Sequence, residues 1–461
     1  MPERITPERS AHPVLFLFMF VPMGISNGYV TVTLGFLLAG AGVGVDAIAV
    51  LGNWALFPQV LKVLAGPLVD ATLTNKSWYL LAAVITGLLI AATGFVPAAA
   101  SNLALITVLV FVISVASAFS ALAADSIMAH ATTPEQKGRA GGWSQAGNLG
   151  GSAIGGGLGL WLAQNLTPGG DSALGQWLTG HTGIVWFTDA FLWLGRHVQA
   201  AVIGGSAVGL LCLLSAIALL YVREPPAGHR AASIAKSIVN VGQDLWGLIK
   251  SRRGLLALVA MTLPISAAAM TQLWPAVAQD WHASGNSVVL INGMLGGVIT
   301  MAGCIVGGWL CDRMNRMAAF NLFSLITCTV ALAAAFSPRT QAMYVLYVGL
   351  YMLITGFCYA AFGAVVLEAI GKGAAATKYN LLASIANVPI MYMAWFDGKA
   401  HVLDAPSWLP LHGSTLMLVA EAFIPVLGTA VFVSVAYFTR RYFKNEAKED
   451  FLTEMFRKPH N

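Results

Sequence analysis

Apolar segments of about twenty residues, separated by short polar ones, follow one another along most of the chain, and this pattern constrains the fold more than any other feature. A helix needs about 20 apolar residues to cross the hydrocarbon core of a bilayer. Only 10% of the 461 residues are charged and 57% are hydrophobic, whereas a soluble domain has about 25% charged residues. The pattern therefore predicts an all-α polytopic membrane protein that is embedded in the lipid bilayer.

Twelve segments have the length and composition of transmembrane helices. The first, from Pro13 onward, is too long for the apolar part of a cleavable signal peptide, so it is read as a span. The predicted spans cover residues 13–38, 45–69, 78–97, 103–128, 142–164, 199–222, 254–278, 287–311, 317–337, 341–370, 380–396 and 415–438.

The distribution of lysine and arginine predicts the orientation. With the amino terminus in the cytoplasm, 22 of the 25 basic residues fall on the cytoplasmic side, and only Arg196, Arg339 and Lys399 fall outside. Basic residues are enriched in the cytoplasmic loops of membrane proteins. Both termini are therefore predicted to be cytoplasmic, and the membrane is the inner membrane if the chain is bacterial. The net charge of +5 reflects this topology and does not indicate nucleic-acid binding.

The chain also repeats itself. Gly66–Asp70 follows the second predicted span, and Gly308–Asp312, with the same spacing from glycine to aspartate, follows the eighth. Arg139 precedes the fifth span as Lys378 precedes the eleventh. Two similar halves in the same orientation are a known plan of secondary transporters, with the substrate site between them near the middle of the membrane. The repeat predicts two pseudo-symmetric six-helix bundles.

The predicted domains are an amino-terminal bundle over 1–222, a linker over 223–253, a carboxy-terminal bundle over 254–438 and a cytoplasmic tail over 439–461. Apolar residues in the linker recur at the i, i+4, i+7 spacing of an amphipathic helix. We expect this helix to lie along the cytoplasmic face.

No group of residues has the spacing of a catalytic or metal site. The nine histidines include no H-E-x-x-H pattern, the five cysteines include no C-x-x-C pattern, and no G-x-x-x-x-G-K-[ST] phosphate loop is present. We therefore predict no catalytic residue, no cofactor and no metal, and an intramembrane enzyme or an ATP-driven pump is disfavoured. A channel or receptor stays open as an alternative, although repeated halves fit alternating access better than a single pore.

Charged residues within the predicted spans are candidates for coupling or gating. Lys62 lies about two turns inside the end of span two, Asp125 at a comparable depth in span four, and Glu368 in span ten. A charge at the bilayer centre costs about 2.5–3.5 kcal/mol, so such residues usually face a partner or a wet cavity. We predict a pair between Lys62 and Asp125, with Glu368 near Lys378. The alternative is that Lys62 extends to the membrane interface, as long basic side chains do.

Polar and aromatic residues in the spans are candidates for the substrate cavity, although each is equally suited to a hydrogen bond between helices. They are Asn27, Tyr29, Gln59, Gln145, Asn148, Gln272, Trp274, Asn292, Tyr359 and Asn387.

Span five has glycines at every fourth position: Gly147, Gly151, Gly155 and Gly159. A stripe of this kind permits close approach of another helix. It is expected either to pack an ordinary neighbouring helix or to form a sliding contact between the two halves.

A resemblance to a known family rests on the segment Gly308-x-x-x-Asp312-Arg313-x-x-Arg316. It resembles the signature between spans two and three of the major facilitator superfamily, here in its second-half copy. In the first half Asp70 is present, but Ala71 stands where the arginine would be. The resemblance implies that Asp70, Asp312, Arg313 and Arg316 act in gating, by contacts made in one conformation only.

A narrower resemblance covers most of the chain. The segment from Phe57 to Asp70, the segment Thr133–Arg139 and the segment Ala376–Asn380 are similar to those of muropeptide permeases of the AmpG type and the related acetyl-CoA transporters and siderophore permeases. The resemblance implies a secondary active transporter that imports a small polar or amphipathic solute by alternating access, as a monomer. Protons are the expected coupling ion, with Asp125 or Glu368 as carrier. A facilitative carrier or an exporter of the same superfamily is the alternative.

Overall fold

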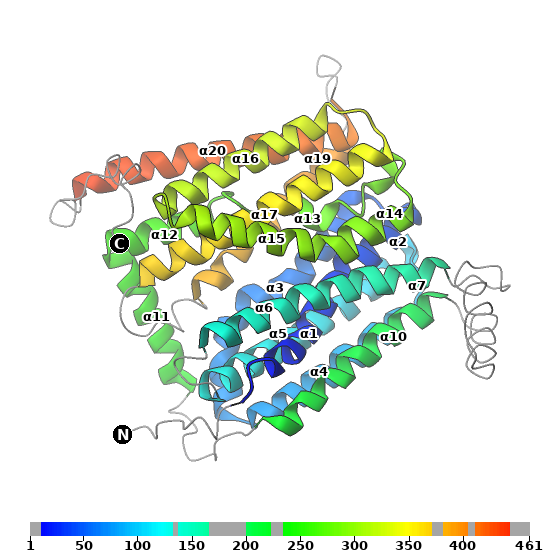
Figure 1. Ribbon diagram of the computed structural model, residues 1–461, viewed down its shortest axis with the longest axis horizontal. Coiled ribbons are helices and arrows are strands. Elements are labelled where there is room, and N and C mark those ends of the chain that lie inside the picture. The colour runs from blue at the N-terminus through cyan, green and yellow to red at the C-terminus, as the bar shows by residue number, and fades with distance from the viewer. Residues whose placement is uncertain are drawn as a thin grey trace. The chain divides into compact units, whose positions relative to one another are not determined.

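The computed structural model describes residues 11–131, 137–165, 200–222, 234–370, 381–403 and 411–442, and these ranges are helical with short connections and contain no strand (Figure 1). Within them, 8 helices are long and apolar enough to cross a membrane: Leu15–Gly40, Asn75–Thr93, Ala100–Met128, Ala201–Tyr221, Gly285–Cys311, Arg316–Ala335, Gln341–Val366 and Gly413–Arg440. The predicted all-α membrane fold is confirmed, while the total of twelve spans stays a prediction.

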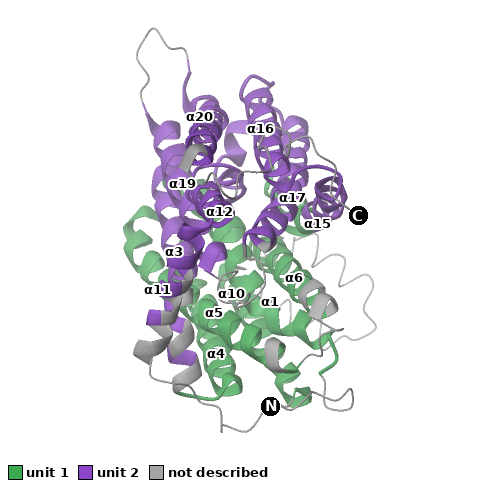
Figure 2. Cartoon of the chain, turned by 90° about the vertical axis from the view of Figure 1, so that its left-hand side faces the viewer, with its two compact units in different colours: residues 1–43, 72–230, 284–297 green, residues 44–71, 231–283, 298–461 purple. Residues whose placement is uncertain are grey.

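The chain divides into two compact units that do not follow the order of the sequence (Figure 2). The first unit contains residues 1–43, 72–230 and 284–297, and the second contains residues 44–71, 231–283 and 298–461. The second predicted span therefore groups with later helices, and the start of the eighth groups with earlier ones. The predicted boundary at 222–254 concerns the repeated halves of the sequence and is a different division.

The first unit is built from the following elements. They are α1 (Leu15–Gly28), the π-helical η2 (Tyr29–Leu34), α2 (Gly35–Gly40), α4 (Asn75–Thr93), η3 (Ala100–Asn102), α5 (Leu103–Ala131), α6 (Lys137–Ala153), the π-helical η5 (Ile154–Leu158), α7 (Gly159–Asn165), α10 (Ala200–Ser215), η6 (Ala216–Tyr221), α14 (Gly285–Val288) and the π-helical η9 (Val289–Met294).

Glycines bring the backbones of α1 and α6 into direct contact. A Cβ atom added to Gly151 would lie 2.5 Å from the carbonyl oxygen of Val21 and 3.1 Å from the Cα of Gly24. Gly147 and Gly155 meet the backbone of α1 in the same way, one turn before and one turn after. The glycine stripe predicted from the sequence therefore packs the first span within the same predicted half, and the alternative of a sliding contact between halves is wrong for this stripe.

The second unit contains α3 (Val45–Ala71), α11 (Ile234–Lys250), α12 (Arg252–Thr262), α13 (Met270–Leu273), η8 (Ala278–Trp281), α16 (Arg316–Ala335), α17 (Gln341–Ile370), α19 (Asn387–Val402) and α20 (Gly413–Tyr442). The helix α15 (Leu295–Cys311) begins in the first unit and continues in the second. The predicted amphipathic helix of the linker corresponds to α11.

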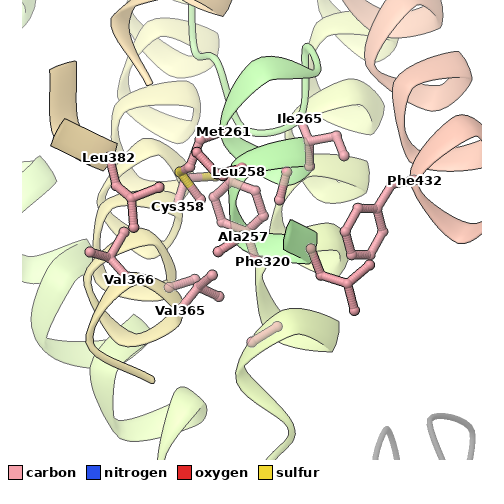
Figure 3. Packing of buried hydrophobic residues seen from close by; sticks show 14 of the residues in the cluster. Ala257, Leu258, Met261, Ile265, Phe320, Cys358, Val365, Val366, Leu382 and Phe432 are labelled. Atoms are coloured by element: carbon pink, nitrogen blue, oxygen red, sulfur yellow. The ribbon is translucent and has the colours of Figure 1, made fainter. Parts of the chain in front are cut away.

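The core of the second unit is apolar and lies between α12, α16, α17 and α20. Figure 3 shows Leu258 and Met261 of α12 against Phe320 of α16, Cys358 of α17 and Phe432 of α20, all of them buried. Burying a side chain of this size is worth about 1.5–3 kcal/mol relative to water. In the membrane, the same contacts contribute mainly through close packing.

The predicted seventh span, 254–278, is not one continuous helix, because α12 ends at Thr262 and α13 begins only at Met270, so the expectation of an uninterrupted helix is wrong. The helix α12 ends at Thr262, just before Pro264, which has no N–H and whose ring prevents an uninterrupted helix. Ser266 and Ala268 then adopt φ values of 57° and 51°, a region that residues with a Cβ rarely occupy. Hydrogen bonds to α16 hold the break: Ser266 N donates to Ser324 Oγ at 2.9 Å, and Ser266 Oγ donates to the carbonyl of Phe320 at 3.0 Å.

Span eleven also differs from its prediction. The prediction ended this span at 396, but α19 continues to Val402. Asp397 and Lys399 therefore lie on the helix and not in the following loop. Charged residues near a helix end lower the hydropathy of a window without interrupting the helix, which explains the early predicted end.

The α1–α6 contact leads to a test with a matched control on one helix. Gly151→Ala places a methyl group against the backbone of α1, and overpacking of this kind costs about 1–3 kcal/mol. A Cβ atom added to the neighbouring Gly150 would have no other atom within 4 Å, so Gly150→Ala should be neutral or stabilise the helix by up to about 1 kcal/mol. Thermal unfolding in detergent should show a lower transition temperature for Gly151→Ala only. Equal transition temperatures would contradict the contact.

Candidate functional site

An ion pair joins the first turn of α3 to the last turn of α19, within the second unit. Lys399 Nζ donates to Asp46 Oδ2 at 2.8 Å. Asp46 lies at a helix amino terminus and Lys399 near a helix carboxy terminus, where each charge is favoured by the helix dipole. In the predicted topology this pair lies at the outer ends of spans two and eleven, which come from different predicted halves.

Beneath the ion pair, α3 and α19 approach each other at a glycine. A Cβ atom on Gly398 would lie 2.7 Å from the Cβ of Ala49 and 2.9 Å from the Cα of Asp46. Further along α3, a Cβ on Gly52 would lie 2.8 Å from Gln272 Oε1. The α3–α19 contact is therefore a close backbone contact capped by one exposed ion pair.

A second polar cluster lies beside it, on the predicted outer side of the same unit. His401 Nε2 lies 2.8 Å from Asp280 Oδ2, and Ser414 donates a hydrogen bond to the same oxygen. Partial burial opposes ionisation of Asp280, but hydrogen bonds from His401 and Ser414 keep the pKa of its carboxyl below the ordinary value. Arg339 stacks 4.2 Å over the ring of Trp281 and donates to Thr415 Oγ1 at 2.6 Å. These contacts tie η8 to the ends of α16, α19 and α20.

The first unit has a comparable crossing between η5 and η9, which come from predicted spans five and eight. A Cβ atom on Gly157 would lie 3.3 Å from the N of Met294, and one on Gly293 would lie 2.7 Å from the N of Gly157. Both segments are π-helical at the crossing, and π-helical turns are often found at functional positions. Two crossings of this kind, α3–α19 and η5–η9, each join one helix from each predicted half.

The residues of the superfamily-like signature lie at the other end of the second unit. Arg316 Nη1 lies 3.5 Å from Glu368 Oε2, so two of the predicted gating residues form an ion pair. Arg313 stacks 3.8 Å over Trp309 and donates to its carbonyl oxygen at 3.0 Å. Asp312 is exposed directly after α15.

The other predicted coupling residues are placed as follows. Lys62 is half-buried on α3 in the second unit, and Asp125 is half-buried on α5 in the first. A pair between them stays a prediction. Asp70 lies on α3, but its side chain is outside the described part, and Lys378 is outside the described residues altogether.

The cavity candidates fall into two groups. Asn27, Tyr29, Gln145, Asn148 and Asn292 lie in the first unit, and Gln59, Gln272, Trp274, Tyr359 and Asn387 lie in the second. Tyr29 is buried and shares a hydrogen bond of 2.9 Å with Thr93, and Asn387 donates to the carbonyl of Ala383 at 3.0 Å. These two have structural partners, whereas Asn27, Gln145 and Tyr359 are exposed on their helices.

Trp274 is the centre of a buried aromatic cluster in the second unit. Its ring lies 6.2 Å from Trp281, 6.0 Å from Tyr344 and 6.0 Å from Tyr351, in each case edge to face. Tyr344 also donates to the Trp274 carbonyl at 3.0 Å. Edge-to-face pairs are worth about 0.5–1.5 kcal/mol each beyond area burial, so the cluster stiffens the region beside the break in span seven.

The sequence reading missed two acidic residues, Asp397 and Glu421. Both are buried, at 0% and 2% exposure. Glu421 could have been found, because a glutamate inside an apolar run is by default a functional candidate in a membrane protein. Asp397 was assigned to the loop after span eleven, so its burial could not be inferred.

Comparison with known proteins decides the family. The sequence model of the Major Facilitator Superfamily matches residues 14–394 of this chain. This chain belongs to the Major Facilitator Superfamily. No curated protein sequence matches it.

Solved structures of superfamily transporters share the fold. A bacterial homologue of the human lysosomal transporter Spinster, inward-facing and unoccupied, superposes with a TM-score of 0.65 at 16% identity over 95% of this chain and 98% of that one. The nucleoside transporter NupG superposes with a TM-score of 0.62 at 11% identity, over 91% of this chain and 98% of that one. The D-xylose-proton symporter superposes with a TM-score of 0.60 at 12% identity, over 90% of this chain and 96% of that one. At these identities the likeness concerns the fold.

The α3–α19 contact allows two kinds of interaction to be ranked. An exposed ion pair contributes about 0.2–1 kcal/mol, whereas overpacking against a backbone costs about 1–3 kcal/mol. Gly398→Ala should therefore lower the thermal stability more than Asp46→Asn or Lys399→Gln. Gly363→Ala is the control, because a Cβ atom added there would have no other atom within 4 Å. If removing the ion pair destabilises the protein more than Gly398→Ala does, the packing interpretation is wrong.

Proposed function

We propose that this protein is a secondary active transporter that imports a small polar or amphipathic solute by alternating access, coupled to protons. Membership of the Major Facilitator Superfamily supports transport. Two of its structural relatives are a nucleoside transporter and a D-xylose-proton symporter, and both of these solutes are small and polar. The resemblance to AmpG-type permeases favours import of a solute of similar polarity.

The observation that carries the proposal is the pair of crossings α3–α19 and η5–η9. Each joins helices from different predicted halves, and both lie toward the predicted outer ends of their spans. Alternating access requires contacts that close one side of the membrane and can be given up when the other side closes. Smooth glycine contacts fit this requirement, because no long side chain has to be withdrawn before the helices separate.

The break in predicted span seven supports a solute site in the second unit. Irregular backbone at membrane depth is tolerated only where protein buries it or where it lines a cavity, and interrupted helices form binding sites in many transporters. Gln272 and Trp274 follow directly after the break and are proposed to contact solute. Gln59, Asn292, Tyr359, Asn27, Gln145, Asn148, Tyr29 and Asn387 stay as further candidates.

Proton coupling is proposed through Asp125 or Glu368. Glu368 Oε2 lies 3.5 Å from Arg316 Nη1, and separation of this pair in one conformation would leave the carboxylate without its basic partner. Arg313, Asp312, Lys62, Asp70 and Lys378 are proposed to act in gating. A facilitative carrier or an exporter is the alternative, and a channel or receptor is less well supported because two similar halves favour alternating access.

The proposal is tested with purified protein in sealed vesicles. Thermal shift with uridine, D-xylose and a muropeptide selects a probe, and counterflow of the labelled probe then distinguishes a carrier from a channel. An imposed pH gradient should drive accumulation, and an uncoupler should abolish it. Asp125→Asn or Glu368→Gln should remove accumulation yet preserve counterflow. Uptake that ignores the pH gradient would leave a facilitative carrier as the function.

A further inference from the structure

Two carboxyl groups meet inside the second unit, away from the residues proposed above for proton coupling. Asp397 on α19 is 0% exposed, and Glu421 on α20 is 2% exposed. The two carboxyl groups lie within hydrogen-bonding reach of each other. Tyr351 on α17, also fully buried, donates a hydrogen bond to Glu421 Oε1. Side chains from three helices of the unit thus converge on one acidic centre.

The centre is left incompletely satisfied by the rest of the described chain. Apart from the contact between the two carboxyl groups, neither carboxyl oxygen of Asp397 has a hydrogen-bond partner there, and Glu421 Oε2 has none either. No described lysine, arginine or histidine forms an ion pair with either group. Buried polar groups in proteins nearly always have partners, so two fully buried carboxyl groups that contact each other are suited to hold a proton between them.

The described side chains around the acidic centre supply no positive charge that would allow both carboxyl groups to be ionised. Within the described part of the chain, the thiols of Cys358 on α17 and Cys328 on α16 interact electrostatically with Glu421, while Tyr392 of α19 donates a hydrogen bond to the carbonyl of Thr262. Asp46 of α3 is already paired with Lys399. An isolated buried carboxylate is costly, and two carboxylates side by side repel each other strongly unless a cation or a proton lies between them.

The centre lies next to the break in span seven. Ala267 and Ala269 of the break pack against Met393 and Ala394 of α19, and Ile424 of α20 joins the same cluster. Ala394 and Ile424 each lie three residues from an acidic residue of the centre, about one helical turn. Charge at the centre therefore acts on helices that pack directly against the interrupted segment of span seven.

We propose that Asp397, Glu421 and Tyr351 form a proton-binding site. The site holds one proton shared between the two carboxyl groups. On release, that proton passes from a carboxyl oxygen to water, leaving two negative charges, and on uptake the reverse occurs. Tyr351 keeps its own proton throughout and stabilises Glu421 as a hydrogen-bond donor. The role of the site in transport rests on the proposed proton coupling. The presence of a proton in the site is independent of that coupling.

Infrared difference spectroscopy of the purified, reconstituted protein tests the occupancy without a transport assay. Wild-type protein at neutral pH should show the carbonyl stretching band of a buried protonated carboxylic acid. The double variant Asp397→Asn with Glu421→Gln should lose this band, whereas Asp46→Asn, which removes a carboxylate already paired with lysine, should keep it. A band unchanged in the double variant would overturn the proposal, and so would a band removed by sodium chloride at constant pH, which would assign the site to sodium.

Tyr351→Phe keeps the shape of the side chain, so it provides a second test of the site if the double variant does not fold. Loss of the phenol donor should shift the band, and an unshifted band would count against the site. Transport separates the two proposals: if a pH gradient drives uptake in wild type, Glu421→Gln should lower the driven accumulation at least tenfold and leave counterflow within twofold. If wild-type uptake ignores the gradient, the proposed function fails, and the infrared result still decides the proton site.

Discussion

Close approach of helix backbones at glycine is the interaction on which this structure depends. In lipid, apolar side chains gain little by leaving one apolar surrounding for another, so helices associate through van der Waals packing at small residues. Gly24 and Gly151 bring α1 and α6 together in the first unit, and Gly303 and Gly356 do the same for α15 and α17 in the second. A Cβ on Gly303 would lie 3.1 Å from the Cα of Gly356. The long apolar side chains fill the space that these crossings set.

The same constraint explains where the charged groups lie. Ion pairs occur at helix ends, as with Asp46 and Lys399 or Arg316 and Glu368, where at least part of each side chain reaches solvent. Such pairs cost little to form and little to break. Asp397 and Glu421 are different because they lie at depth without a basic partner among the described residues. One shared proton removes one of the two negative charges of such a pair.

The class of fold was predictable because the length of each apolar segment and its glycines can be read directly along the chain. The family was predictable from the segment between Gly308 and Arg316. The break in span seven had a signal in Pro264, but its conformation depends on Ser324 and Phe320 of another helix. The acidic centre could not be predicted. Asp397 and Glu421 meet only because α19 and α20 pack together, and no spacing within either helix records that contact.

The arrangement on α19 offers a physical route between proton binding and opening of the transporter. Asp397 is part of the acidic centre. The next residue, Gly398, contacts α3, and Lys399 pairs with Asp46. Loss of the shared proton leaves two like charges between α19 and α20, and their repulsion favours a displacement of α19. The same displacement changes the glycine contact with α3, because a rigid helix moves adjacent residues together. The exposed ion pair between Asp46 and Lys399 is weak enough for the free energy of one ionisation to exceed it.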